Sequence, residues 1–432
     1  MTPYAAPALV SYGIIIQTMN GHDTALRLAC LARKLIEATN GTAMIGRTQI
    51  SSCPCIYSWS RPQEKQFKDL ELGYRSSMQV GDVETAFFNW YIHVDLGFMM
   101  GNDLSRLVQS HRAIMREAKE YHVLSIQRMI GVQLPVMEGM AGEKPINWVD
   151  VRNFGARSGS REAPNDTYFL TAGYAARLRV AVYFQQYDVA GELADRFEKL
   201  EVDKATYNVI VPQLLFVGLA AAGCYRSTNK KKHLKRLQQK VQEFKSLVRH
   251  RGLNCLHHSL LLTAQLKAVT ASPQRKIKDA YDIAIAIAHK AGCMQDVALA
   301  SELAGETFRR MGVKEVATTY FMEATIQYSQ WGCKAKVDDI KKRHTKYLDL
   351  RHLAKVEANN TNVGKMTIPM IGFNPRDVSS NDTIGGESGV LTSTSPTMPS
   401  FGSVNQAGDM LFPYQQGTCT DQDDDISMLS DD

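Results

Sequence analysis

The segment from 295 to 336 constrains the fold of this chain more than any other part of the sequence. It contains two stretches with a 3.6-residue apolar period, which are joined at Met311-Gly312. Small side chains let two helices approach closely, and aromatic rings fill the gaps between them. The segment has both kinds at positions where paired helices touch, namely Gly305, Phe308, Ala317, Phe321 and Ala324. This packing pattern contains no catalytic group.

The same spacing recurs near the N-terminus and, less completely, in two other places. The copies comprise Tyr12-Gly13 and Ile16 with Ala25, Ala29 and Ala32; Ala280 and Ala284, followed by the bulky Ile287; and Ala190, Ala194 and Phe197. Any alanine-rich amphipathic helix shows small residues at i, i+4 and i+7. The additional glycine in two distant copies nevertheless favours true repeats of tetratricopeptide type.

Helical periodicity continues through most of the first 350 residues, and no segment shows convincing strand alternation. Turn residues such as Asn20-Gly21 and Ala291-Gly292 separate the helical stretches. Helices of about 15–20 residues with short turns predict antiparallel neighbours stacked in order, which is an all-α solenoid. The predicted helices span 5–19, 23–39, 43–58, 62–80, 83–99, 103–120, 122–138, 167–186, 188–201, 205–223, 231–250, 254–270, 275–291, 295–311, 314–331 and 334–350.

Composition and length suggest four parts: N-terminal helical repeats in 1–138, an inserted loop in 139–166, C-terminal helical repeats in 167–352, and a tail in 353–432. The loop is expected to dock on the body through Trp148, Val149 and Val151. The tail is rich in Ser, Thr, Gly, Asn and Pro, so it is expected to be disordered. It has three basic and eleven acidic residues, net −8, which leaves 47 basic and 33 acidic residues, net +14, in the body. The two can associate or bind different partners.

The eight cysteines are scattered, and only Cys53-Pro54-Cys55 is close-set. Reduced, buried thiols in a cytoplasmic protein are therefore expected. The start of the chain lacks the basic region and cleavage site of a signal peptide. The longest apolar run, 209–223, contains Pro212 and is shorter than the roughly 20 residues that span a bilayer. A buried central helix is predicted there, and no membrane span.

Two groups of side chains are candidate sites. Cys255, His257 and His258 are potential metal ligands. Neighbours along a helix point about 100° apart, so these residues are not expected to share a site without loop partners, and no metal site is expected. A basic cluster at a helix start is a candidate surface for a protein partner, unless it is simply a solvated face. The cluster comprises Lys230, Lys231, Lys232, Lys235 and Arg236. We expect it to be enlarged by Arg226, Arg249, His250 and Arg251.

Such a cluster can contact acidic proteins, anionic lipid or RNA phosphates. No aromatic stacking platform or known module accompanies it, so nucleic-acid binding is not expected. In the tail, Ser395 precedes a proline, and Ser427 and Ser430 stand among acidic residues. These three serines are candidate phosphorylation sites.

On these residues the chain resembles the helical-repeat region of large bacterial and algal signalling proteins. Those proteins combine a serine/threonine kinase-like domain, an AAA-type ATPase, this repeat region, a GAF domain and a histidine kinase or cyclase. The likeness covers about residues 1–350 and is strongest in 254–336. Its most specific elements are Trp331-Gly332 and the run from Lys334 to Val337.

The resemblance implies the fold and a signalling context, but the catalytic motifs of those domains are missing from this sequence. We therefore expect a non-enzymatic scaffold without a cofactor, in which stacked helix pairs present a concave groove to a protein partner. The alternative is a regulatory fragment of an ATP-dependent signalling kinase or nucleotide cyclase whose catalytic domains lie on another chain or are missing. A third reading is an enzyme with a novel site near the 139–166 loop.

Overall fold

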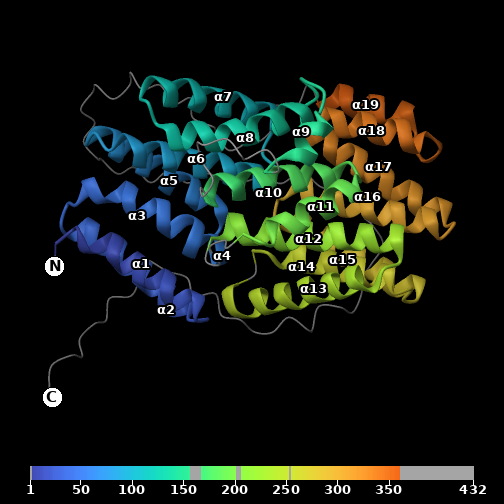
Figure 1. Cartoon of the computed structure of the whole chain (residues 1–432), viewed down its shortest axis with the longest axis horizontal. Helices are drawn as coiled ribbons and strands as arrows, with labels where there is room; N and C mark the ends of the chain where they lie inside the picture. The colour runs from blue at the N-terminus through green and yellow to red at the C-terminus, as the bar shows by residue number, and fades with distance from the viewer. Residues whose placement is uncertain (1, 156–166, 201–205, 253, 361–432) are drawn as a thin grey trace, which may run out of the picture. The chain divides into compact units, whose positions relative to one another are not determined.

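Helices joined by short turns account for nearly all of the chain that the computed structural model describes, which comprises residues 2–155, 167–200, 206–252 and 254–360. No strand forms within these ranges, and the predicted all-α class is confirmed. Figure 1 shows successive helices running back and forth as antiparallel neighbours. The disordered tail was predicted to begin at residue 353, but residues 353–360 are helical. The rest of the predicted tail, from residue 361 onward, lies outside the described residues.

The helical elements, in chain order, are α1 (Ala5–Thr18), α2 (His22–Ala38), η1 (Thr42–Met44), α3 (Ile45–Ser52), η2 (Cys53–Tyr57), α4 (Ser58–Ser60), α5 (Gln63–Gln79), α6 (Val83–Met99), α7 (Leu104–Glu120), α8 (Leu124–Met140), α9 (Trp148–Asn153), α10 (Thr167–Tyr183), α11 (Tyr187–Phe197), α12 (Tyr207–Thr228), α13 (Lys231–Arg251), α14 (Leu256–Val269), α15 (Gln274–Lys290), α16 (Met294–Arg310), α17 (Lys314–Trp331), α18 (Lys334–His344), η3 (Thr345–Tyr347) and α19 (Leu350–Asn360).

Most of the predicted helices agree with these bounds to within a few residues, and three segments differ. The helix predicted at 43–58 is divided, because residues 53–57 around Pro54 form a π-helical turn. The helix predicted at 334–350 ends at His344, and α19 follows it. The loop predicted at 139–166 contains the short helix α9, which Asn147 caps by accepting hydrogen bonds from two backbone N–H groups.

The loop docks on the body partly as predicted. The ring of Trp148 lies 5.9 Å from that of Phe184, and Val151 is buried. Val149, by contrast, is exposed, because the short helix turns its side chain to solvent. The backbone oxygen of Arg152 accepts a hydrogen bond of 2.6 Å from Arg196 in α11. These contacts attach the segment to α10 and α11.

The turn residues explain why the helices stop where the sequence indicated. Asn20 has a φ of 68° and Gly312 a φ of 77°, and both occupy the left-handed region that ends a helix. Asparagine and glycine are the residues that adopt this conformation at least cost. The predicted punctuation is therefore a backbone requirement.

The predicted packing positions lie at helix–helix contacts. A side chain on Gly305 would place its Cβ 2.9 Å from Cδ1 of Phe321, so only glycine lets α16 and α17 approach this closely. Ala317 and Ala324 are fully buried in the same interface. The N-terminal copy behaves alike, since a Cβ on Gly13 would lie 3.3 Å from the backbone oxygen of Ala25.

Each helix packs mainly against its neighbours in sequence, as in a helical-repeat array. The described residues belong to one compact unit, in which further contacts join the N-terminal helices to the C-terminal ones. Helix α18 contacts α8, and α12 contacts α6 and η2. The Asn254 side chain donates hydrogen bonds of 2.9 Å to the backbone oxygens of Ser58 and Arg61. The two predicted sets of repeats therefore share a centre.

Helix α12 passes through this centre. It is long and apolar enough to cross a membrane by length and composition alone, but 89% of its apolar window is buried by other helices. The helix predicted from the apolar run at 209–223 is thus buried, as expected.

Candidate functional site

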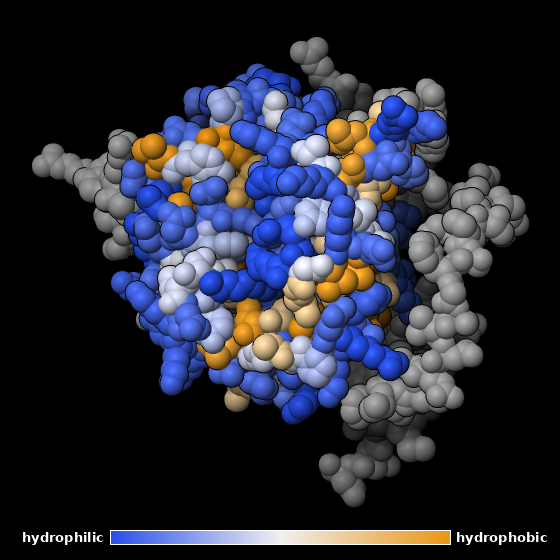
Figure 2. All heavy atoms as spheres, turned by 90° about the vertical axis from the view of Figure 1, so that its right-hand side faces the viewer, coloured by the Kyte–Doolittle hydropathy of each residue, from blue (hydrophilic) through white to orange (hydrophobic). Residues whose placement is uncertain are grey.

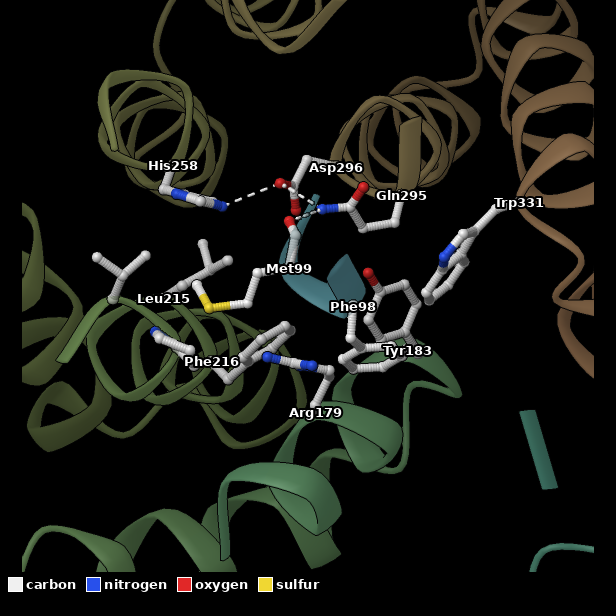
Figure 3. Close-up of a pocket in the computed structure, with 12 residues that line it drawn as sticks. Phe98, Met99, Arg179, Tyr183, Leu215, Phe216, His258, Gln295, Asp296 and Trp331 are labelled. Carbon is white, nitrogen blue, oxygen red and sulfur yellow. Dashed lines mark hydrogen bonds and ion pairs between the residues drawn. The ribbon is translucent and has the colours of Figure 1, made fainter. Parts of the chain in front are cut away.

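The centre of the array is filled by side chains from six helices, as Figure 3 shows. They leave a cavity of about 20 Å³, which is room for one water molecule. A peptide cannot enter here, so the concave groove that the sequence suggested is not found at this centre. The lining residues are Phe98, Met99, Arg179, Tyr183, Val211, Pro212, Leu215, Phe216, His258, Gln295, Asp296 and Trp331.

A partly buried arginine lies among the aromatic rings. The guanidinium carbon of Arg179 is 4.4 Å from the ring centroid of Phe98 and 5.4 Å from that of Phe216. Burial lowers the pKa of Arg179, and attraction to Asp95 opposes this shift. Burial raises the pKa of Asp95, although this carboxylate accepts a 2.6 Å hydrogen bond from Asn208. These groups link α6, α10 and α12.

Two adjacent histidines converge on one aspartate beside the cavity. The Nε2 atoms of His257 and His258, in the first turn of α14, each lie 3.0 Å from Oδ2 of Asp296, in the first turn of α16. The two ring centroids are 3.9 Å apart, and all three side chains are buried. We call this group the His–Asp cluster.

The expectation that neighbouring histidines cannot share a site without loop partners is wrong. The 100° step of a helix fixes the directions of the Cβ atoms, but rotation about the side-chain bonds moves an imidazole nitrogen much farther. A third side chain from another helix supplies the common partner. Cys255, the third residue considered, precedes α14 as its N-cap, and it does not belong to this group.

The His–Asp cluster is strongly polarised. Burial alone would raise the pKa of Asp296, yet attraction to His258 and the hydrogen bonds from both imidazoles hold it well below its usual range. Burial and His258 oppose protonation of His257, but Cys293 and Asp296 raise the pKa of this imidazole above its ordinary value. The side-chain nitrogen of Gln295 donates to Asp296 and to the backbone oxygen of Met99, so the cluster also connects α16 to α6.

A second buried polar group joins α16, α17 and α18. Glu302 accepts hydrogen bonds from Lys336 at 2.8 Å, Arg343 at 2.9 Å and Tyr328 at 3.0 Å. Lys336 itself is fully buried. The run from Lys334 to Val337, singled out in the sequence, therefore contains one half of an interior ion pair.

In contrast to these buried ion pairs, exposed basic residues gather where α12, α14 and α16 end and α13, α15 and α17 begin, at the right-hand side of Figure 1. We call this surface the basic edge. Figure 2 faces it and shows mostly hydrophilic atoms interrupted by separate apolar patches. Among the described turns that form it, Glu315 is the single acidic residue, against Arg226, Lys230, Lys231, Lys232, Lys235, Lys267, Arg275, Lys276, Arg309, Arg310 and Lys314.

The basic edge contains a hollow of about 280 Å³ between the ends of α12, α14 and α16. Arg226 and Arg310 line it together with apolar groups such as Val269 and Met311. Burial and then the like charge of Arg226 lower the pKa of Arg310, and Glu306, which pairs with this guanidinium at 3.3 Å, opposes the shift. Gln265 holds Arg226 by accepting its hydrogen bond. The geometry suits an anionic group placed between the two arginines.

The predicted basic cluster divides into two parts. Lys230, Lys231, Lys232 and Lys235 are exposed, and none of them pairs with a carboxylate in the described part of the chain. Arg236 instead points to α11, where it lies 2.5 Å from Asp195 and 3.1 Å from Glu198. The lysines belong to the basic edge, whereas Arg236 fastens α13 to α11.

Of the residues expected to enlarge the cluster, only Arg226 does so. Arg249, His250 and Arg251 lie at the other end of α13, roughly 27 Å away at 1.5 Å per residue. Arg251 is also buried, 5.1 Å from the ring of Trp59. Ser395, Ser427 and Ser430 lie outside the described residues.

The cysteines within the described ranges form no disulfide with one another, and all are buried. Cys53 and Cys55 lie in the π-helical turn η2. Burial raises the pKa of the Cys53 thiol well above its usual value, so this group stays protonated and inert at neutral pH.

Sequence reasoning missed Asp296 and Arg310. Asp296 gave no signal, because its partners are 38 and 39 residues away. Arg310 did have a sequence signal. Arg309-Arg310 lies at the end of α16, as Arg226 lies at the end of α12 and Lys267 at the end of α14. Since successive helices run in opposite directions, these three helix ends fall at one edge.

No protein-family model matches the chain, and no curated protein sequence matches it either. The resemblance to the repeat region of multidomain signalling proteins therefore stays a prediction.

Proposed function

We propose that this protein is a helical-repeat scaffold that binds an acidic segment of a partner protein along its basic edge. The observation that carries the proposal is the hollow of about 280 Å³ that Arg226 and Arg310 line. Arginine pairs well with carboxylates, and the apolar groups beside it suit a neighbouring hydrophobic side chain. The preferred ligand is therefore an acidic residue next to an apolar one.

The lysines at the start of α13 support this function because they are unfavourable for the fold. The N-terminus of a helix carries a partial positive charge, so acidic residues stabilise it and basic residues do not. Lys230 is nevertheless the N-cap residue of α13, the helix begins with Lys231 and Lys232, and its first turn contains no acidic residue. A bound acidic segment would compensate this charge and be attracted over a distance set by the ionic strength.

Binding to a labelled peptide tests the proposal. The probe is a fluorescein-labelled peptide in which glutamates flank a single leucine, and a glutamine version is the neutral control. Fluorescence anisotropy is measured with the wild-type protein, with an Arg226→Glu/Arg310→Glu variant and with a Lys119→Glu/Arg128→Glu variant. The last pair is exposed on α7 and α8, away from the basic edge.

We expect the arginine pair variant to bind the acidic peptide at least tenfold more weakly, and the control variant to bind it like the wild type. Equal weakening in both variants would mean that net charge alone attracts the peptide and would contradict the proposal. Tighter binding of an RNA oligonucleotide than of a peptide of the same charge would assign the basic edge to nucleic acid instead.

A further inference from the structure

Potential metal ligands meet in the interior at the His–Asp cluster. One donor atom from each of His257, His258 and Asp296 lies within 4.8 Å of the other two. Within the described residues, this is the one group of three or more His, Cys, Asp or Glu side chains with that spacing. The helices place these donors before any ion is bound, since they come from the rigid first turns of α14 and α16.

The distances suit a small divalent ion. Zinc binds imidazole nitrogen at about 2.0–2.1 Å and carboxylate oxygen at about 2.0–2.2 Å, which places tetrahedral ligand atoms roughly 3.3 Å apart. The two Nε2–Oδ2 distances are 3.0 Å, slightly shorter than that spacing. A small outward movement of the rings would therefore admit the ion. The cavity of about 20 Å³ borders His258 and Asp296 and offers space for this adjustment.

A fourth donor is adjacent. Cys293 is the N-cap residue of α16 and is buried next to His257, but its sulfur lies outside the group of three donors and has to turn toward the ion to bind it. Two imidazoles, a carboxylate and a thiolate form a donor set that zinc accepts in closed, four-coordinate sites. We propose that His257, His258, Asp296 and Cys293 bind one zinc ion with a structural role.

The charge balance favours this assignment in a dry interior. An isolated charge is costly to bury, whereas Zn²⁺ with one carboxylate and one thiolate has no net charge. The thiol releases its proton to solvent as the Zn–S bond forms, and the imidazoles bind through their neutral form. The ion would connect α14 to α16 next to Met99 of α6, where the N-terminal and C-terminal helices meet.

The side chains of the two histidines and of Asp296 are at most 6% exposed, so the ion enters during folding and not through an open channel. The full-length protein is therefore unfolded and refolded with either zinc or a chelator, and excess metal is removed on a desalting column. Zinc is then released in denaturant and measured with a chromogenic chelator. Wild type, Asp296→Asn and Cys293→Ala are compared. The control is Asp95→Asn, which alters another buried carboxylate of the same centre.

We expect close to one equivalent of zinc from the wild type and from the control, at least tenfold less from Asp296→Asn, and a partial loss from Cys293→Ala. Circular dichroism identifies variants that fail to fold. Cobalt refolding of the wild type adds a measurement independent of the variants, because tetrahedral Co²⁺ absorbs strongly in the visible range and a thiolate ligand adds a charge-transfer band. A wild-type protein that folds without retaining zinc or cobalt would overturn the proposal.

Discussion

The centre of the array and its basic edge carry charge in opposite ways. At the centre, Asp296 and Glu302 are buried, and each is surrounded by hydrogen-bond donors from other helices. At the edge, the lysines of α13 are exposed and unpaired with any carboxylate of the described chain. Buried, compensated charge holds helices in one arrangement, whereas exposed, uncompensated charge remains available to a ligand. Stability and binding are thus separated within one molecule.

The largest loss of stability is expected when a buried charge loses its ion-pair partner. Glu302→Ala removes the buried carboxylate that Lys336, Arg343 and Tyr328 share and leaves Lys336 only the partly exposed Asp339, 2.9 Å away. Breaking a buried ion pair costs about 3–5 kcal/mol. Urea unfolding followed by circular dichroism measures this loss. The control, Glu315→Ala, removes an exposed acid from the first turn of α17 at the basic edge and should lower the free energy of unfolding by less than about 1 kcal/mol. Similar losses in both variants would remove the distinction between the two regions.

A pH titration sharpens the comparison, because only buried ionisable groups resist protonation strongly. Burial lowers the pKa of His93 to about 4 from an ordinary value of 6.5. Between these values the unfolded chain binds a proton that the folded chain does not, so stability is highest above pH 6.5 and falls as the pH decreases toward 4. The linkage amounts to about 1.4 kcal/mol per pH unit, or about 3 kcal/mol over the full range.

The variant His93→Phe tests this assignment and keeps an aromatic ring beside Phe67, whose centroid is 4.8 Å away. Its unfolding free energy, measured by urea titration at several pH values, should decline less steeply below pH 6.5 than that of the wild type. His250→Gln, at an exposed position at the end of α13, serves as the control and should leave the slope unchanged. An unaltered slope in His93→Phe would assign the acid sensitivity to other histidines, such as His111, whose pKa burial also lowers.

The two regions also differ in how far the sequence revealed them. Helices, turns and the tight contact at Gly305 were predictable, because each depends on residues within one helix or in the next one. The lysines of α13 were visible for the same reason. The His–Asp cluster was not, since it joins first turns of helices nearly 40 residues apart, and side-chain rotation overcame the expected 100° separation. The filling of the centre likewise depends on contacts between α6, α12 and α16, which no local pattern specifies.

The smallest expected change is a gain in stability, in contrast to the loss predicted for Glu302→Ala. Replacing Lys231 and Lys232 by glutamate places acids at the N-terminus of α13, where the helix dipole favours them, by about 0.3–1 kcal/mol for each position. The variant is therefore expected to be slightly more stable in urea, and the gain should shrink at high salt as the charges are screened. The same variant should bind the glutamate peptide more weakly. Lys245→Glu changes an exposed lysine in the middle of α13, where the dipole has little effect, and should alter neither stability nor binding appreciably. A loss of stability in the double variant would show that these lysines support the fold, and the edge would then resemble the centre.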